Sequence, residues 1–208
     1  MKSVFCSALI PLALLVLIPF ASAADAAKSV GVGGSFKGPV GLQLYSLRAD
    51  FMRAVTPALE TVKQFGFKYV ELAGTYNLPP EKFKEMLDAH GFVPVSGHFP
   101  YDRYKTDPES IAREAKALGL RYAGCAWINH QGEFGEAAAR DAITVFNRAG
   151  EVLARHGIQF FYHTHGYEFR PHGSGTFFDL IVAETKPEWV AFQMDVFWVG
   201  HPDRKSVV

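Results

Sequence analysis

Residues 154–165, ARHGIQFFYHTH, decide the fold of this chain. The stretch joins the end of a helical segment to Gly157, and an apolar run follows the glycine at once. A glycine in this place takes the left-handed conformation that ends a helix, and aromatic runs of this kind are typical of strands. The stretch therefore predicts a helix that leads directly into a buried β-strand.

The same arrangement recurs along the chain. The segments QFGF, AHGF, ALGL and RHGI each place a glycine between a helical segment and an apolar run, at residues 64–67, 89–92, 117–120 and 155–158. The predicted strands are 40–45, 69–72, 93–96, 122–127, 159–163 and 190–196. The predicted helices are 57–65, 80–90, 108–118, 136–156 and 176–184. Strands that alternate with helices in this way predict an α/β fold with a parallel sheet.

Two parallel architectures fit this pattern, an open doubly wound sheet and a barrel. A doubly wound nucleotide-binding sheet has a glycine-rich phosphate turn after its first strand. Here residues 46–50, SLRAD, follow the first strand, and the GVGG at 31–34 lies before it. Polar and aromatic residues follow the strands instead, which is typical of a (β/α)8 TIM barrel. About six βα units are present, so we expect an incomplete TIM barrel, because a closed one needs eight strands.

The first 23 residues have the pattern of a secretory signal peptide, with Lys2, an apolar run and the small residues Ala21–Ala23. Cleavage is expected after Ala23, and the alternative is a retained membrane anchor, for which the apolar run is short. Residues 24–38 are predicted to be a flexible leader and 39–208 a partial barrel domain. The chain is therefore expected to be exported, to the periplasm or outside the cell, with Cys125 as its one remaining cysteine.

Composition excludes some classes of partner. The 208 residues include 21 Lys and Arg against 21 Asp and Glu, so nothing predicts binding to nucleic acid or to an anionic membrane surface. Once the signal peptide is removed, no membrane contact is expected. A small-molecule sugar is the expected partner, and association into a homo-oligomer is left open.

The densest polar cluster lies in FYHTHGYEF, residues 161–169. His163 and His165 are two residues apart, so in a strand they point to the same side, and Glu168 follows in the loop. Imidazoles and a carboxylate suit a divalent metal such as Mn, Fe, Co or Zn, although rim histidines also bind substrate without an ion. Asp195 ends an apolar strand, where an isolated charge is costly. The alternative to a functional role is a helix N-cap or an ion pair with an arginine, and no helix is predicted to begin directly after it.

Two further titratable residues end predicted strands, Glu71 in YVELAG and His98 in VPVSGHFP. Together with the histidine cluster they place several such groups at one edge, as in a general acid–base site. Tyr45, Trp127 and Trp198 are expected to supply aromatic walls that stack on the C–H face of a sugar, with core packing as the alternative for each.

Several of these motifs are similar to those of a known family. The segments GLQLYSLR, YVEL, SGHF, YHTHGYEF and MDVFWV, at 41–48, 69–72, 96–99, 162–169 and 194–199, resemble the sugar phosphate isomerase/epimerase family. Members of that family have the xylose isomerase-like TIM-barrel domain. The resemblance covers about residues 40 to 200, and its most specific blocks are the histidine motif and DVFWV.

The resemblance implies one divalent metal, whether Mn, Zn, Co, Fe or Mg, held by residues from the later strands. Asp195 matches the sixth-strand ligand, and the fifth-strand ligand comes from His163, His165 or Glu168. Relatives continue with two strands that bring a His and a Glu to the metal, whereas this sequence ends in WVGHPDRKSVV. The predicted metal ligands are His165, Glu168 and Asp195, and the predicted catalytic groups are Glu71, His98, His163 and Glu168.

These features predict a metal-dependent isomerase or epimerase of a sugar or keto-sugar, which moves a proton next to a carbonyl. One alternative is a lyase or hydratase of keto-glycosides on the same fold. The other is a non-catalytic carbohydrate-binding fragment, in which aromatic walls remain but the metal shell is incomplete.

Overall fold

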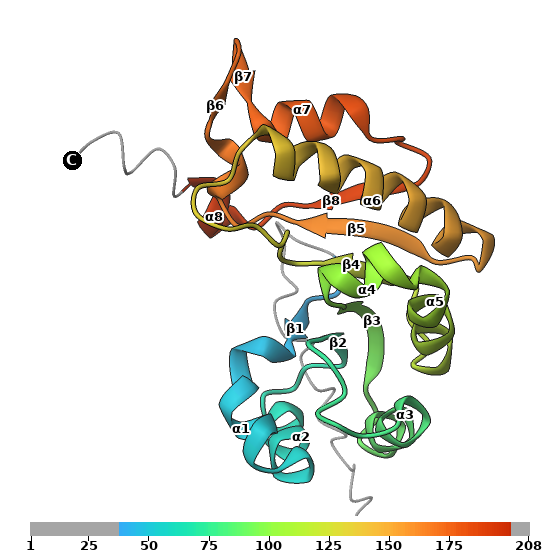
Figure 1. The fold of residues 1–208 in the computed structure, drawn as a ribbon. Helices are drawn as coiled ribbons and strands as arrows, with labels where there is room; N and C mark the ends of the chain where they lie inside the picture. Colours follow the sequence, from blue (N-terminus) through green and yellow to red (C-terminus); the bar gives the residue numbers. More distant parts are fainter. Residues whose placement is uncertain (1–37, 201–208) are drawn as a thin grey trace, which may run out of the picture.

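The computed structural model describes residues 38–200, which form a parallel sheet with helices along one face (Figure 1). The predicted signal peptide and almost all of the predicted leader lie outside the described residues. The sheet has six strands in the order β1-β2-β3-β4-β5-β8, and all neighbouring pairs are parallel. The strands are β1 (Gly41–Gln43), β2 (Tyr69–Leu72), β3 (Val93–His98), β4 (Tyr122–Cys125), β5 (Gln159–His163) and β8 (Val190–Gln193).

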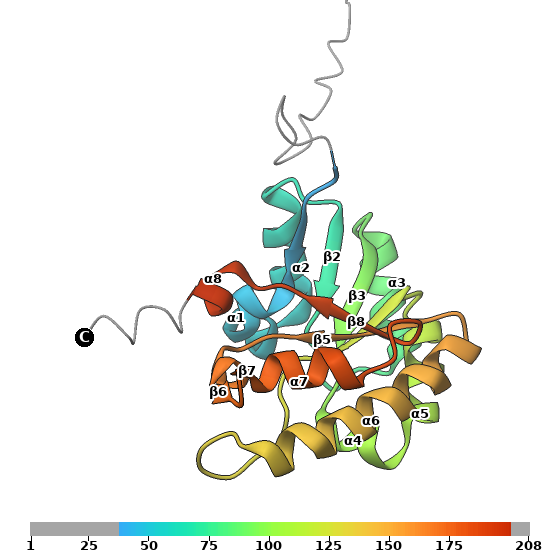
Figure 2. The ribbon, with the colours of Figure 1, turned by 90° about the horizontal axis from the view of Figure 1, so that it is seen from above.

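Helices lie between successive strands of this sheet, and the last helix follows the last strand. They are α1 (Arg48–Arg53), α2 (Val55–Gln64), α3 (Pro80–Ala89), α4 (Tyr101–Thr106), α5 (Pro108–Ala117), α6 (Glu136–Arg155), α7 (Phe177–Glu184) and α8 (Val196–Gly200). Short 3₁₀ turns lie at Leu44–Leu47 and Tyr167–Phe169, and β6 (Pro171–His172) pairs with β7 (Gly175–Thr176) in a small hairpin. Helices α6 and α7 lie side by side over the β5–β8 end of the sheet (Figure 2). Within residues 38–200, no helix is long and apolar enough to cross a membrane.

The predicted α/β fold is confirmed, and the four helix-ending glycines explain why the sequence reveals it. Gly66, Gly91, Gly119 and Gly157 all have φ between 72° and 80°, in the left-handed region. Each helix therefore stops at its glycine, and the chain turns back into the next parallel strand. The architecture is that of an incomplete TIM barrel, with β1 and β8 at the two ends of the sheet.

Several predicted boundaries differ from the structure, and those next to the site are the ones that matter for function. Tyr45 lies in the 3₁₀ turn Leu44–Leu47 rather than in the first strand. The third strand continues two residues further than predicted, to His98, whereas the last strand ends at Gln193. A helix, α8, begins directly after Asp195, contrary to the expectation that none does. The Asp195 carboxylate accepts hydrogen bonds from the backbone N–H groups of Phe197 and Trp198 in the first turn of α8.

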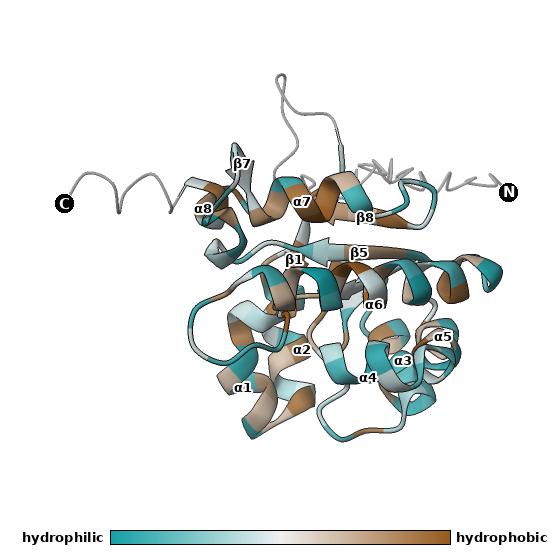
Figure 3. Ribbon diagram, turned by 45° about the horizontal axis from the view of Figure 1, so that its top comes forward, coloured by the Kyte–Doolittle hydropathy of each residue, from teal (hydrophilic) through white to brown (hydrophobic). Residues whose placement is uncertain are grey.

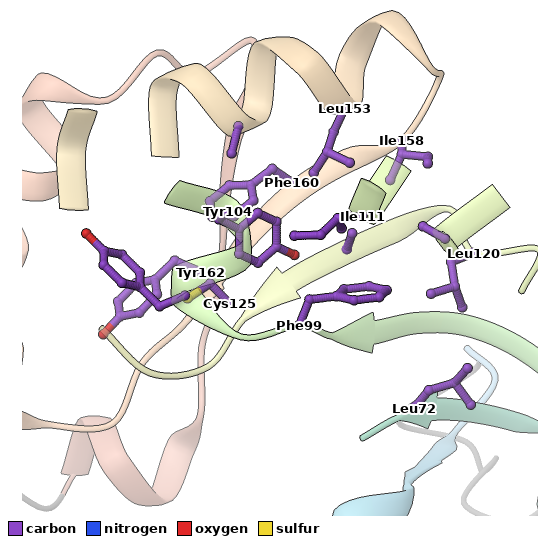
Figure 4. Close-up of a cluster of buried hydrophobic side chains, with 14 of the residues drawn as sticks. Leu72, Phe99, Tyr104, Ile111, Leu120, Cys125, Leu153, Ile158, Phe160 and Tyr162 are labelled. Atoms are coloured by element: carbon purple, nitrogen blue, oxygen red, sulfur yellow. The ribbon is translucent and has the colours of Figure 1, made fainter. Parts of the chain in front are cut away.

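The hydrophobic core lies between the sheet and the helices. Phe160 and Tyr162 of β5 point toward α6, where both rings contact Phe146 with centroids 5.0 and 5.1 Å apart. Tyr104 of α4 meets Phe160 edge-on at 5.0 Å (Figure 4). Hydrophilic and hydrophobic residues alternate along α6 in Figure 3, as expected for a helix with one buried face. Because strand residues alternate in direction, Phe161 and His163 point to the opposite, inner face of the sheet.

Gly150 offers a stability test of the contact between α6 and the sheet. A Cβ atom at this position would lie 2.6 Å from the backbone oxygen of Trp189. Alanine normally stabilises a helix interior relative to glycine by about 1 kcal/mol. Here we expect Gly150→Ala to lower the free energy of unfolding by about 1–3 kcal/mol, because backbone atoms must move apart. Urea denaturation measures the change, and Thr144→Ala on the exposed side of α6 is the control, expected to be neutral or slightly stabilising.

Candidate functional site

A half-buried carboxylate, Glu71 of β2, is the centre of a polar cluster on the inner face of the sheet. Its oxygens accept hydrogen bonds from Gln43 Nε2 at 2.6 Å, Ser96 Oγ at 2.6 Å and Gln193 Nε2 at 2.8 Å. The Nε2 atom of His98 lies 3.3 Å from Glu71 Oε1. Four strands, β1, β2, β3 and β8, therefore converge on one carboxylate near their carboxyl ends, where barrel enzymes carry their chemistry.

The charges of Glu71 and His98 follow from this environment. Burial acts to raise the pKa of the Glu71 carboxyl, but His98 and the hydroxyl and amide donors outweigh it and hold that pKa below its usual value. Burial lowers the pKa of His98, more than the Glu71 carboxylate raises it. At neutral pH, a carboxylate therefore lies beside an uncharged imidazole that can accept a proton.

Gln193 connects Glu71 to His163 of β5. Its Oε1 atom lies 2.6 Å from His163 Nδ1, while its amide nitrogen donates to Glu71. A carboxylate only accepts hydrogen bonds, so the NH₂ group of Gln193 must face Glu71, and its oxygen must face His163. The proton of neutral His163 is therefore on Nδ1, and the lone pair of Nε2 is free.

Asp195 lies on the other side of His163. Its Oδ2 atom is 3.6 Å from His163 Nε2, and its Oδ1 atom accepts hydrogen bonds from the backbone N–H groups of Phe197 at 2.8 Å and Trp198 at 3.1 Å. One oxygen thus caps the N-terminus of helix α8, while the other faces the imidazole of His163. A neutral imidazole nitrogen and a carboxylate oxygen that face each other both offer lone pairs, an arrangement that a cation between them would satisfy.

The tautomer of His163 can be tested directly. Replacing Gln193 by leucine removes the acceptor on Nδ1, so we expect the His163 proton to move to Nε2, toward Asp195. Two-bond ¹⁵N–¹H NMR correlations of the imidazole distinguish the two tautomers. Gln43→Leu is the matched control, because Gln43 also donates to Glu71 but has no bond to His163. An Nε2-protonated His163 in the unmodified protein would contradict the assignment.

The structure places the predicted aromatic residues around two cavities beside this cluster. The first cavity, of about 400 Å³, is lined by Tyr45, His98 and Trp127 among others, and we call it the His98 cavity. The second, of about 530 Å³, is lined by rings that include Trp127, His165 and Trp198, and we call it the aromatic cavity. A third, of about 580 Å³, lies toward the strand starts, with Glu71 and Gln193 in its wall.

His165 belongs to the aromatic cavity rather than to the polar cluster around Glu71. Its ring lies 4.9 Å from that of His163, 5.7 Å from that of Trp127 and 5.4 Å from that of Trp198, between centroids. Burial and the neighbouring His163 lower its pKa, which favours the uncharged ring. His165 thus connects the polar cluster to the aromatic cavity.

Glu168 is not brought to the polar cluster. Its carboxylate accepts hydrogen bonds from the His165 backbone N–H at 2.9 Å and the Tyr162 hydroxyl at 3.2 Å, and burial raises its pKa. Tyr162 points toward α6, so Glu168 stabilises the turn after β5 from the helix side. The predicted ligand set of His165, Glu168 and Asp195 is therefore not assembled, and no three His, Cys, Asp or Glu residues among 38–200 come together as a metal site.

Three residues of the cluster, Gln43, Ser96 and Gln193, were not predicted from the sequence. The signal that identifies them is strand parity, since each faces the same side as a titratable residue on its own or the neighbouring strand. Gln43 pairs in register with Glu71, Ser96 precedes His98 by two residues, and Gln193 pairs with His163. Uncharged polar residues in strands are common, so this signal becomes informative only when the register is known.

The fold and its polar strand ends define a protein of the TIM-barrel class. The chain belongs to the xylose isomerase-like TIM barrel family, whose sequence profile matches residues 59–204. A comparison with curated proteins finds no match.

Several solved structures share this fold. A sugar phosphate isomerase/epimerase from Parabacteroides distasonis has a TM-score of 0.65 at 23% identity, over 83% of this chain and 73% of its own. A xylose isomerase-like TIM barrel protein from Mycobacterium smegmatis, in complex with magnesium, has a TM-score of 0.59 at 11% identity. The match covers 77% of this chain and 65% of the other. A D-allulose 3-epimerase from Methylomonas sp. has a TM-score of 0.53 at 16% identity. The match covers 72% of this chain and 59% of the epimerase. At these identities the likeness shows the fold alone.

Proposed function

We propose that this chain carries the proton-transfer site of a metal-assisted isomerase or epimerase that acts on a sugar or keto-sugar. The observation that supports this most is the pairing of Glu71 with His98 and of His163 with Asp195 at the strand ends. The family and the sugar isomerase and epimerase names among the structural neighbours agree with it.

In this proposal His98 accepts the proton next to the carbonyl. Its imidazole is uncharged at neutral pH, lines the His98 cavity and lies 3.3 Å from the Glu71 carboxylate. When His98 takes up a proton, the adjacent carboxylate stabilises the imidazolium. Gln43, Ser96 and Gln193 keep that carboxylate charged and in place by donating to it. Returning a proton to the opposite face of the same carbon gives epimerisation. Returning it to the neighbouring carbon, while the hydroxyl proton moves to the former carbonyl oxygen, gives isomerisation.

His163 and Asp195 fit two positions of a divalent-metal shell. The free Nε2 lone pair of His163 and the Oδ2 atom of Asp195 are the nitrogen and oxygen ligands that such ions accept. When bound there, a divalent ion would polarise the carbonyl and hydroxyl oxygens of the sugar. We therefore assign the fifth-strand ligand to His163 rather than to His165 or Glu168.

Tyr45 and Trp127 are proposed to hold the reacting sugar in the His98 cavity. Tyr45 has 55% and Trp127 49% of its surface exposed. Arg48 lies over one face of Tyr45 and His130 stacks on one face of Trp127, so the C–H face of the sugar would contact the opposite face of each ring.

Hydrogen exchange with solvent tests the proposed function. The protein is incubated with divalent metal and a panel of free aldoses, ketoses and keto-glycosides in D₂O, and ¹H NMR follows the hydrogens next to the carbonyl. We expect deuterium to enter at one carbon of at least one sugar in the panel. The absence of exchange across the panel would overturn the proposal.

A further inference from the structure

The aromatic cavity is separate from the His98 cavity but adjacent to it. Trp127 is in the wall of both. The rings of His98, His163 and His165 form a continuous row between them, with centroids 5.3 and 4.9 Å apart in turn. The proposed proton transfer takes place at His98, at one end of this row, and does not involve the aromatic cavity.

The walls of the aromatic cavity are held in place by contacts from two loops. The imidazole of His130 stacks on Trp127 with centroids 5.2 Å apart and an interplanar angle of 22°. The hydroxyl of Tyr167 accepts a hydrogen bond of 2.8 Å from the backbone N–H of Ile128, and its ring meets Trp127 edge-on at 4.8 Å. The loops that follow β4 and β5 are thereby joined, and the cavity is formed before any ligand binds.

The rim of the aromatic cavity is charged. Arg170 donates to Glu133 at 2.6 Å, and their side chains are 40% and 81% exposed. Flat aromatic walls beside exposed hydrogen-bonding groups are complementary to a sugar ring, which presents C–H groups on its faces and hydroxyls at its edge. The volume of about 530 Å³ is within the range of small-molecule sites.

We propose that the aromatic cavity binds a second sugar ring, so that the preferred substrate is a glycoside rather than a free monosaccharide. This inference rests on the proposed function for the placement of the reacting ring in the His98 cavity. The second ring lies between Trp127 and Trp198, and Arg170 and Glu133 contact its hydroxyls. The indole of Trp127 contacts both rings of the bound glycoside.

Equilibrium binding tests this inference without turnover. The dissociation constants of methyl β-D-glucoside, cellobiose and maltose are measured by isothermal titration calorimetry on the complete chain. We expect at least one disaccharide to bind about tenfold more tightly than the methyl glycoside, because its second ring stacks on the aromatic side chains of the cavity. Trp198→Ala is expected to reduce that ratio to about one. Val196→Ala is the matched control, because Val196 is on the same helix but lines neither cavity, and its ratio should be unchanged.

Circular dichroism checks that each variant is folded, and Trp198→Phe, which keeps a ring, should restore most of the ratio. Equal affinities for mono- and disaccharides, a ratio that Trp198→Ala leaves unchanged, or no binding of any of the three probes would overturn the inference. The two proposals fail separately. Tight disaccharide binding without deuterium exchange would contradict only the proposed function. Exchange into free sugars with equal affinities for both probe classes would contradict only the second-ring site.

Discussion

Replacing Glu71 by glutamine is expected to slow hydrogen exchange next to the sugar carbonyl by about 10²–10⁴-fold. The amide is almost the same size but carries no charge, so it cannot stabilise the imidazolium that His98 becomes when it accepts a proton. It also turns an NH₂ group toward the donors Gln43, Ser96 and Gln193, one of which must lose its acceptor. The rate is measured by ¹H NMR in D₂O, on the sugar that exchanges fastest with the unmodified protein.

A second carboxylate–histidine pair in the chain supplies the control for this experiment. Glu60 of α2 lies 3.1 Å from His90 Nε2, at the outer end of α3 and away from all three cavities. Glu60→Gln therefore removes the same chemical group from the same kind of pair and should leave the exchange rate unchanged. A Glu71→Gln protein that exchanges as fast as the unmodified one would remove Glu71 and His98 from the mechanism.

Asp195→Asn is expected to remove bound divalent metal while helix α8 remains in place. Asparagine is as favourable as aspartate at the N-cap of a helix, so its side-chain oxygen should keep the hydrogen bonds from the backbone N–H groups of Phe197 and Trp198. The negative charge that faces His163 Nε2 is lost. We expect metal affinity to fall by at least about 10–100-fold, the loss typical even of residues that only support a ligand. Metal content is measured by elemental analysis after dialysis against buffered Mn²⁺ or Zn²⁺.

Two further variants separate metal binding from helix capping. Asp195→Ala removes both the charge and the cap, so it should lose metal and also the circular dichroism of the terminal turn. Asp179→Asn changes an aspartate in the first turn of α7, which forms a capping box with Thr176, and should retain full metal content. Equal metal in the unmodified protein and in Asp195→Asn would exclude Asp195 as a ligand.

The sequence predicts the architecture well because its strongest signals are local. Each helix-ending glycine, such as Gly91 or Gly157, is a property of the backbone at one residue, and it needs no knowledge of the rest of the fold. Helix α8 lacks such a signal. It is five residues long, and its only sequence signal is the capping residue Asp195. Because an apolar strand precedes Asp195, the sequence indicated the end of that strand and not the start of a helix.

The candidate site was predicted only in part, because the positions of its residues depend on the fold and not on local signals alone. Glu71, His98, His163 and Asp195 meet because the carboxyl ends of parallel strands share one edge, which the fold class already implies. Glu168 lies five residues beyond β5, past the left-handed Gly166, and the turn there carries its side chain to the helix side. No periodicity describes that turn, so its direction could not be read from the spacing alone.

The bond between Gln193 and Glu71 joins residues that lie 122 positions apart in the chain. Glu71 is made early in synthesis, yet its geometry depends on the last described strand. Its other partners, Gln43, Ser96 and His98, lie on β1 and β3, so a chain synthesised only as far as β3 would still lack the Gln193 donor. The hydrogen-bonded cluster around Glu71 can therefore be completed only after β8 has been synthesised. The proton transfer that we propose would in this way depend on the synthesis of β8.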